Sequence, residues 1–167
     1  MTLPSVTAII PAAGVGSRMN AEHPKQYLSL AGKPILSHTV ELLLSHPQIT
    51  KVIVALSPED RYFNQLDIAA HPDVTRVEGG KERADSVLNA LNSMKDNSWA
   101  LVHDAARPCV PLDDISSLLS VMSRDDVVGG ILATPVRDTM KRAHTDNKAC
   151  VSHTESRDNL WHALTPQ

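Results

Sequence analysis

A glycine-rich segment near the N-terminus has the residue types of a phosphate-binding turn. Residues 11–19 read PAAGVGSRM and directly follow an apolar run at residues 6–10. Glycines and small side chains let backbone N–H groups come close to a phosphate, and Arg18 adds a positive charge there. The dinucleotide-binding fingerprint is excluded because it needs a glycine where Met19 stands. These residues alone leave a phosphate site and a plain tight turn equally open.

Lys25 puts a second positive charge close to this turn. It lies in the sequence PKQY at residues 24–27, seven residues after Arg18. A lysine ammonium is a compact point charge suited to phosphate oxygens, although most exposed lysines are only solvated. The turn, Arg18 and Lys25 together favour a cradle for a triphosphate. A P-loop is excluded, because neither Gly-Lys pair of the chain is followed by Ser or Thr.

Asp104 is the best candidate for a metal ligand. It lies in VHDAARP at residues 102–108, at the end of an apolar run. Magnesium is commonly held by one or two carboxylates together with substrate phosphates. The alternative for a lone aspartate is a helix or turn cap, and its place after a central strand favours the metal. His103 is expected to be a hydrogen-bonded core or near-site histidine rather than a ligand.

A second glycine-containing loop could contact a flat ligand. Residues 79–86 read GGKERADS and follow a short β-type run. The paired glycines permit close contact of the backbone with a ring, and Ser86 could hydrogen-bond a base from the first helical turn. A loop followed by a helix cap explains the same residues equally well.

The elements that must position these residues alternate between two types. Strands are predicted at residues 6–10, 51–56, 75–77, 99–103 and 127–133. Helices are predicted to begin at 33–35 and 57–60, and apolar spacing at 115–122 predicts another. A further helix is expected to bury one face, formed by Ala84, Val87, Leu88 and Leu91.

This alternation predicts an α/β fold, a Rossmann-like and mostly parallel twisted sheet with helices on both faces. Ligands of such sheets bind at the carboxyl ends of the strands, where the candidate residues lie. Two polar but β-capable segments, 134–142 and 149–154, are joined through Asp146-Asn147 and predict a protruding β-hairpin. Because a polar hairpin cannot bury itself in its own core, it is either a frayed loop or leans on something else.

Composition restricts the classes of function. With 167 residues the chain fits one domain, and its formal net charge of −3 and 3% aromatic residues argue against nucleic-acid binding. Cys109 and Cys150 lack CxxC partners, so no disulfide framework is expected and a cytoplasmic location is predicted. No apolar run has the length of a membrane span, and no signal peptide is expected.

Several of these segments together resemble a known family. The sequences PAAGVGSRM, PKQY, GGKERADSV, HDAARP, PVRDTMKR and LWHALTPQ occur in this order. They resemble the 2-C-methyl-D-erythritol 4-phosphate cytidylyltransferases, which join CTP to a branched polyol phosphate in the non-mevalonate isoprenoid pathway. The resemblance runs from Ala8 to Gln167, and HDAARP and LWHALTPQ are its most specific parts.

The resemblance implies a role for each matched residue. The CTP phosphates would be held by Ala12, Ala13, Gly14 and the catalytic residues Arg18 and Lys25. Gly80 and Ser86 would contact the cytosine, Asp104 would bind Mg²⁺, and the methylerythritol phosphate would face Arg107 and Thr165. The hairpin, residues 134–157, would form a homodimer and complete the partner's pocket with Thr139 and Arg157.

The resemblance also has departures and alternatives. Lys81 stands where some relatives have an acidic residue. Family members continue some tens of residues further, so residues 1–167 would be one nucleotidyltransferase domain that lacks its C-terminal segment. The alternatives are a cytidylyltransferase for another polyol phosphate, such as ribitol 5-phosphate, or a non-catalytic nucleotide-binding and dimerisation fragment.

Overall fold

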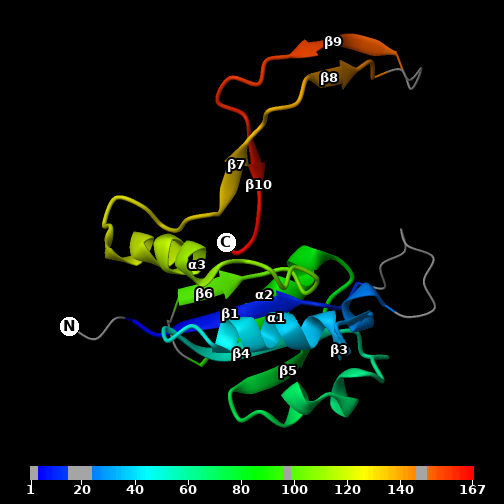
Figure 1. Cartoon of the computed structure of the whole chain (residues 1–167), viewed down its shortest axis with the longest axis vertical. Helices are drawn as coiled ribbons and strands as arrows, with labels where there is room; N and C mark the ends of the chain where they lie inside the picture. The colour runs from blue at the N-terminus through cyan, green and yellow to red at the C-terminus, as the bar shows by residue number, and fades with distance from the viewer. Residues whose placement is uncertain (1–3, 15–23, 96–98, 146–149) are drawn as a thin grey trace.

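A parallel sheet forms the centre of the molecule (Figure 1). The computed structural model describes residues 4–14, 24–95, 99–145 and 150–167. Within them the sheet has the order β5-β4-β1-β6, and all neighbouring strands are parallel. Its strands are β1 (Val6–Pro11), β4 (Ile49–Leu56), β5 (Val74–Glu78) and β6 (Trp99–Val102). The predicted α/β fold is confirmed.

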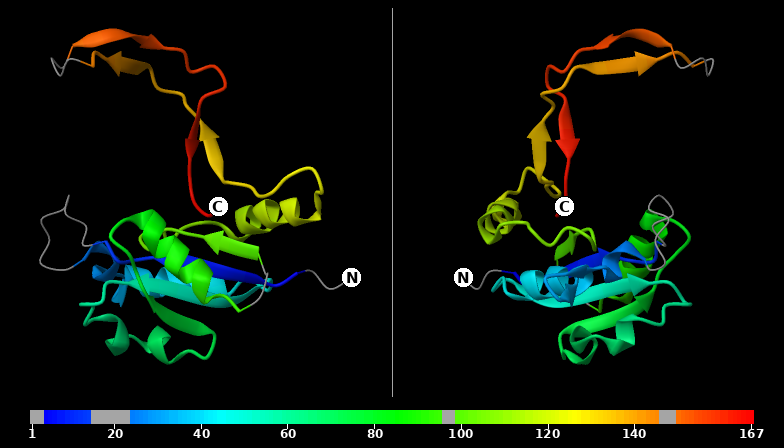
Figure 2. Two further views of the ribbon diagram at one scale, coloured as in Figure 1. Left: turned by 180° about the vertical axis from the view of Figure 1, so that it is seen from behind. Right: turned by 45° about the vertical axis from the view of Figure 1, so that its right-hand side comes forward.

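Helices cover both faces of this sheet (Figure 2). Successive side chains of a strand point to opposite faces. Ile10 of β1 therefore shares a core with α1 (Ile35–Leu44) and α3 (Leu112–Leu119), whereas Ile9 packs with α2 (Arg83–Ser93). The shorter elements are β2 (Ser29–Leu30), β3 (Lys33–Pro34) and the 3₁₀ turns η1 (Lys25–Tyr27), η2 (Phe63–Gln65), η3 (Asp67–Ala70) and η4 (Ser120–Ser123). No helix in these described ranges is long and apolar enough to cross a membrane.

The predicted strand at residues 127–133 is wrong. Val128 in this segment is fully exposed, and only β7 (Ala133–Pro135) forms a strand, paired with β10 (Trp161–Ala163). The edge of β6 is instead contacted by the main chain of Gln167, which exchanges two hydrogen bonds with Val102 at 2.8 and 2.9 Å. A β-type run without an edge to pair with does not become a strand.

Two helix predictions also need correction. Residues 57–60 do not begin an α-helix, because Asp60 accepts the N–H groups of Tyr62 and Phe63 and turns the chain into η2 and η3. In α2 the predicted face is wrong: Leu88 is 54% exposed, while Ser86 and Ala90 are buried. The apolar spacing identified this helix but not its orientation.

A β-arm extends from the sheet (Figures 1 and 2). Its stem is the antiparallel pair β7–β10, and its tip is β8 (Met140–Ala143) paired with β9 (Val151–Glu155). In this structure the two polar β-segments pair with each other. The Asp146-Asn147 turn that was predicted to join them lies outside the described residues. Nearly all side chains of both pairs are exposed, so the arm has no core of its own.

The different burial of two leucines predicts different losses of stability. Leu43 on α1 is fully buried, and Leu43→Ala should lower the free energy of unfolding by about 2–5 kcal/mol. Leu88→Ala removes the same atoms from the exposed face of α2 and should change it by roughly 0.5 kcal/mol or less. Urea unfolding of both variants measures the difference, and equal losses would contradict this orientation of α2.

Candidate functional site

Three loops meet at the carboxyl ends of the parallel strands. Backbone hydrogen bonds to the end of β4 hold two of them: Ala12 N–H donates to Ala55 O at 2.8 Å and Gly79 N–H to Leu56 O at 2.7 Å. A Cβ on Gly79 would lie 2.4 Å from the Cβ of Ala13. The loops after β1 and β5 are thus in direct contact, and only glycine permits their approach.

The predicted phosphate turn is held by a residue that the sequence analysis did not assign. Gln26 lies in η1 beside Lys25, is only 3% exposed, and donates from Nε2 to Ala12 O at 2.8 Å and Gly14 O at 3.5 Å. These contacts point two carbonyls of the turn toward Gln26. Gly14 has open space around the place of a Cβ. Lys25 is exposed, and Arg18 lies outside the described residues.

The predicted base-contacting residues lie together in the second loop. Gly80 N–H donates to Ser86 Oγ at 3.0 Å, and this hydroxyl donates to Glu82 O at 3.2 Å. A Cβ on Gly80 would lie 2.1 Å from the Cβ of Asp85, so the loop requires glycine here. Glu82 and Asp85 form a reciprocal capping box that begins α2. The helix cap expected from the sequence is present, whereas the contact of this loop with a base stays a prediction.

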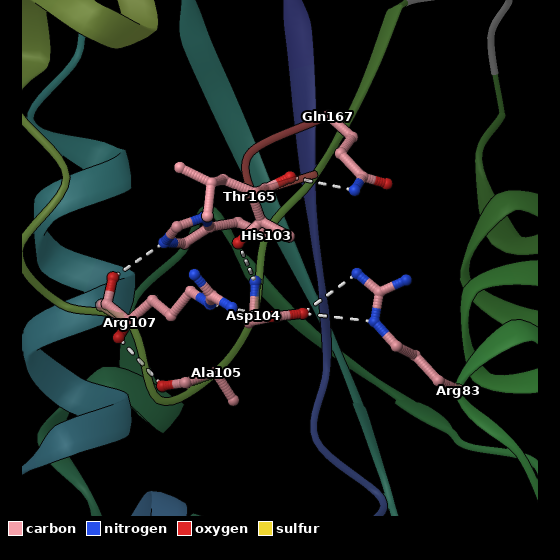
Figure 3. Close-up of polar contacts among 9 residues, drawn as sticks. Arg83, His103, Asp104, Ala105, Arg107, Thr165 and Gln167 are labelled. Carbon is pink, nitrogen blue, oxygen red and sulfur yellow. Dashed lines mark hydrogen bonds and ion pairs between the residues drawn. The ribbon is translucent and has the colours of Figure 1, made fainter. Parts of the chain in front are cut away.

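Asp104 lies between two arginines in the loop after β6 (Figure 3). Its Oδ1 accepts from Arg83 Nε at 3.2 Å and Nη2 at 3.0 Å, and its Oδ2 accepts from Arg107 Nε at 3.1 Å. Its backbone N–H donates to Thr165 Oγ1 at 3.3 Å. Asp104, Arg107 and Thr165 are therefore brought together as predicted. Arg83, which the sequence analysis did not assign, joins them from the first turn of α2.

The loop around Asp104 is fixed from beneath by buried groups. His103 is fully buried and donates from Nε2 to Arg107 O at 2.9 Å, and burial lowers its pKa, so the ring is neutral. Its Nδ1 has no hydrogen-bond partner among the described residues. Thr39 of α1 donates its hydroxyl to Ala105 O at 2.9 Å. His103 thus has the supporting, non-ligating place expected from the sequence.

The segment after β10 brings Thr165 to Asp104. Leu164 N–H donates to Leu132 O at 2.8 Å, and Leu132 N–H donates to Pro166 O at 3.2 Å. The pairing of Gln167 with Val102 completes this path along the edge of β6. Residues at opposite ends of the arm therefore fix the position of one site residue.

Two predicted site residues do not join the others within one chain. Thr139 precedes β8 and Arg157 follows β9, so both lie on the arm rather than at the sheet edge (Figure 1). The Arg157 guanidinium donates to the carbonyl of Arg137, also on the arm.

Asp104 fits a magnesium ion that is also held by phosphates. A carboxylate offers about four lone-pair sites. Three N–H groups occupy three of them, and one remains on Oδ2. The side chain is 31% exposed, within reach of a ligand. No group of three metal-ligating side chains occurs among the residues that the structure describes, so phosphate or water oxygens would have to supply the other ligands of such an ion.

Comparison with known proteins identifies the family. Residues 6–167 match the family model "IspD: 2-C-methyl-D-erythritol 4-phosphate cytidylyltransferase". The chain belongs to this family. A cytidylyltransferase of this name from Alteromonas mediterranea is 64% identical over 167 residues, which are 100% of this chain and 69% of the relative. Its counterpart from Vibrio vulnificus is 58% identical over 170 residues, which cover 99% and 70% of the two chains.

Solved structures agree with this assignment. A crystal structure of 4-diphosphocytidyl-2C-methyl-D-erythritol synthase superposes with a TM-score of 0.80 and 34% identity, over 100% of this cytidylyltransferase and 75% of that chain. The 2-C-methyl-D-erythritol 4-phosphate cytidylyltransferase of Francisella tularensis superposes with a TM-score of 0.78 and 37% identity. That match covers 97% of this chain and 70% of the other.

The contact of Gln26 with the phosphate turn predicts a binding defect in this cytidylyltransferase. Gln26→Met keeps the length of the side chain but removes the donor to Ala12 O. Binding of inorganic triphosphate, measured by calorimetry, should weaken about 3- to 10-fold, the effect of one net hydrogen bond. The matched control is Gln65→Met, which removes an exposed side-chain donor to Arg61 O and should bind as the unmodified protein does. Equal binding by the two folded variants would contradict a positioning role for Gln26.

Proposed function

We propose that this chain carries out cytidylyl transfer from CTP to 2-C-methyl-D-erythritol 4-phosphate, a step in isoprenoid precursor synthesis. The products are 4-diphosphocytidyl-2-C-methyl-D-erythritol and pyrophosphate. The observation that carries this proposal is the meeting of three loops, after β1, β5 and β6, at one sheet edge. It occurs in a chain that matches the family model over residues 6–167.

The chemistry needs little from the protein beyond position and charge. An oxygen of the substrate phosphate attacks the α-phosphorus of CTP and forms a new P–O bond. The bond from the α-phosphorus to the oxygen bridging to the β-phosphorus breaks, and pyrophosphate leaves with its electron pair. A phosphate monoester, with a second pKa near 6, is largely dianionic at neutral pH, so no general base is required. Catalysis then rests on orientation and electrostatic stabilisation.

We assign a different part of the two substrates to each group of site residues, according to the loop on which the residues lie. We assign the triphosphate to the turn formed by Ala12, Ala13 and Gly14, in which the N–H of Ala12 is itself held by Ala55 O. Arg18 and Lys25 would neutralise the charge that develops on the leaving pyrophosphate. Gly80 and Ser86 contact the cytosine, because they form the loop beside this turn. We assign the methylerythritol phosphate to Arg107 and Thr165, which contact the carboxylate and the backbone N–H of Asp104.

Asp104 is proposed to hold the Mg²⁺ ion of the reaction. The carboxylate has an oxygen with a free lone-pair site and lies at the carboxyl end of β6, the edge strand of the described sheet. When bound, the ion would supply positive charge to the phosphates. Asp104 itself would hold that charge beside the phosphate turn.

The arm is proposed to act in a homodimer. It exposes large apolar side chains, among them Trp161 at 57% on β10 and Val151 on β9, and the cations Lys141 and Arg142 on β8. Such a surface is typical of a protein interface. In a two-fold dimer, Thr139 and Arg157 of each arm would complete the partner's pocket. We also place the enzyme in the cytoplasm, because Cys109 and Cys150 lack CxxC partners in the sequence.

The direct test of the proposed function is turnover of CTP with candidate acceptors. Purified protein with Mg²⁺ should release pyrophosphate with 2-C-methyl-D-erythritol 4-phosphate and be at least tenfold slower with ribitol 5-phosphate. Mass spectrometry should find the diphosphocytidyl product. A preference for ribitol 5-phosphate would replace the proposed acceptor. CTP binding without turnover of either acceptor would support a nucleotide-binding and dimerisation fragment instead.

The dimer proposal predicts complementation between two inactive variants. Lys25→Ala removes a phosphate contact and should lower kcat about 10²–10³-fold, and Arg157→Ala should damage the pocket of the partner. In a mixed dimer one site carries both changes and the other carries neither. Random exchange makes half of the dimers mixed, so about a quarter of all sites should recover activity. If the mixture stays inactive although exchange is verified by mass spectrometry, Arg157 does not act on the partner's site.

A further inference from the structure

The carboxylate assigned to magnesium is already held by two positive charges from different elements (Figure 3). Arg83 comes from the first turn of α2 and directs both Nε and Nη2 to Oδ1, while Arg107 reaches Oδ2 from the same loop as Asp104. A divalent cation approaching this carboxylate therefore meets two guanidinium groups. Because like charges repel at such distances, the arginines and the cation compete for Asp104.

Arg83 also connects the two parts of the site. Arg83 lies three residues after Gly80, and the capping box between Glu82 and Asp85 fixes its place at the start of α2. Its side chain ends at Asp104, 21 residues further along the chain. One arginine thus extends from the loop proposed to contact the base to the carboxylate proposed to hold the ion.

The contact between Arg83 and Asp104 is of a kind that a ligand can break. The Arg83 side chain is 49% exposed and that of Asp104 31%. Ion pairs exposed to this extent contribute little free energy, because water screens them. A guanidinium also binds phosphate in the same bidentate manner as carboxylate. A nucleotide phosphate placed beside α2 would therefore offer Arg83 an equivalent partner.

From these contacts we infer that Arg83 couples the binding of nucleotide to the binding of the divalent cation. Without nucleotide, Arg83 occupies Oδ1 of Asp104 and weakens cation binding. With nucleotide, its guanidinium transfers to a phosphate oxygen and leaves the carboxylate to the ion. The site then binds the cation mainly when there are phosphates to neutralise. This inference rests on the proposed function, in which Asp104 is the cation ligand and α2 borders the nucleotide.

Two binding measurements without turnover test this coupling. In the first, Mn²⁺ alone is titrated into the protein and the free ion is followed by electron paramagnetic resonance. Arg83→Met should bind Mn²⁺ roughly 3- to 10-fold more tightly than the unmodified protein, because one repelling charge is gone. In the second, CTP is titrated by calorimetry in the presence of a chelator. Here Arg83→Met should bind several-fold more weakly, because a phosphate contact is lost.

Matched variants make the result specific to this residue. Arg124→Met breaks a similar arginine–aspartate pair, with Asp126, elsewhere on the surface, and should change neither affinity. Arg83→Lys keeps the charge without the fork, so its Mn²⁺ affinity should stay near that of the unmodified protein. Thermal melts check that each variant is folded. A folding defect would weaken both ligands and could not give opposite changes.

The outcomes separate this inference from the proposed function. If Asp104→Asn leaves Mn²⁺ binding unchanged, the metal assignment is wrong and the coupling falls with it. If Asp104→Asn weakens Mn²⁺ binding but Arg83→Met leaves it unchanged or weaker, the metal assignment stands and the coupling is overturned. Unchanged CTP affinity in Arg83→Met would equally overturn it, because the guanidinium would then have no second partner.

Discussion

β1 lies between β4 and β6 in parallel register, with Pro11 opposite Ala55 and Ile9 opposite Val102. Parallel strands place their carboxyl ends at the same edge, so the chain leaves all three strands at one place. The phosphate turn follows β1, the Asp104 loop follows β6, and the loop after β5 contacts β4 through Gly79. Every proposed role at the sheet edge depends on this register.

The carboxylate in the loop after β6 faces two guanidinium groups, which leaves an excess of positive charge in this cluster. Asp104 is the carboxylate to which Arg83 and Arg107 both turn, and buried His103 and Thr39 hold its loop in place. The arrangement presents cations for a phosphate-rich ligand and one carboxylate for a metal ion. It suits phosphoryl chemistry, in which neutralising charge matters more than moving protons.

The sequence predicted the elements whose signal is local. Apolar runs located β1 and β4, because strands buried on both faces are apolar along their length. Shorter β-type runs located β5 and β6, which are only partly buried. Residues 127–133 have the same signal, but the edge of β6 is contacted by Gln167, a pairing between residues far apart in the chain. The exposed face of α2 was missed for a related reason: helical spacing does not reveal which side faces the sheet.

The candidate site was likewise predicted where the sequence signal is local and missed where it depends on contacts between distant residues. Asp104, Arg107 and Thr165 could be predicted from motifs, and the structure brings them together. Gln26 and Arg83 were missed because each acts on a partner 12 or more residues away, a carbonyl or a carboxylate that no spacing rule connects to it. The sequence offered only one clue to these two residues: each lies within a motif that was already noted for another residue.

The central claim is that the loop after β6 holds a cation for nucleotidyl transfer, and the magnesium dependence of Asp104→Asn tests it most directly. Asparagine keeps the shape but loses the charge, so the variant should stay folded within about 1 kcal/mol. Its turnover of CTP should fall about 100-fold or more at the magnesium concentration that saturates the unmodified protein, and rise again at higher magnesium. Asp126→Asn, at the exposed pair with Arg124, should behave as the unmodified protein does. An Asp104→Asn protein with unchanged turnover and unchanged magnesium dependence would contradict the account.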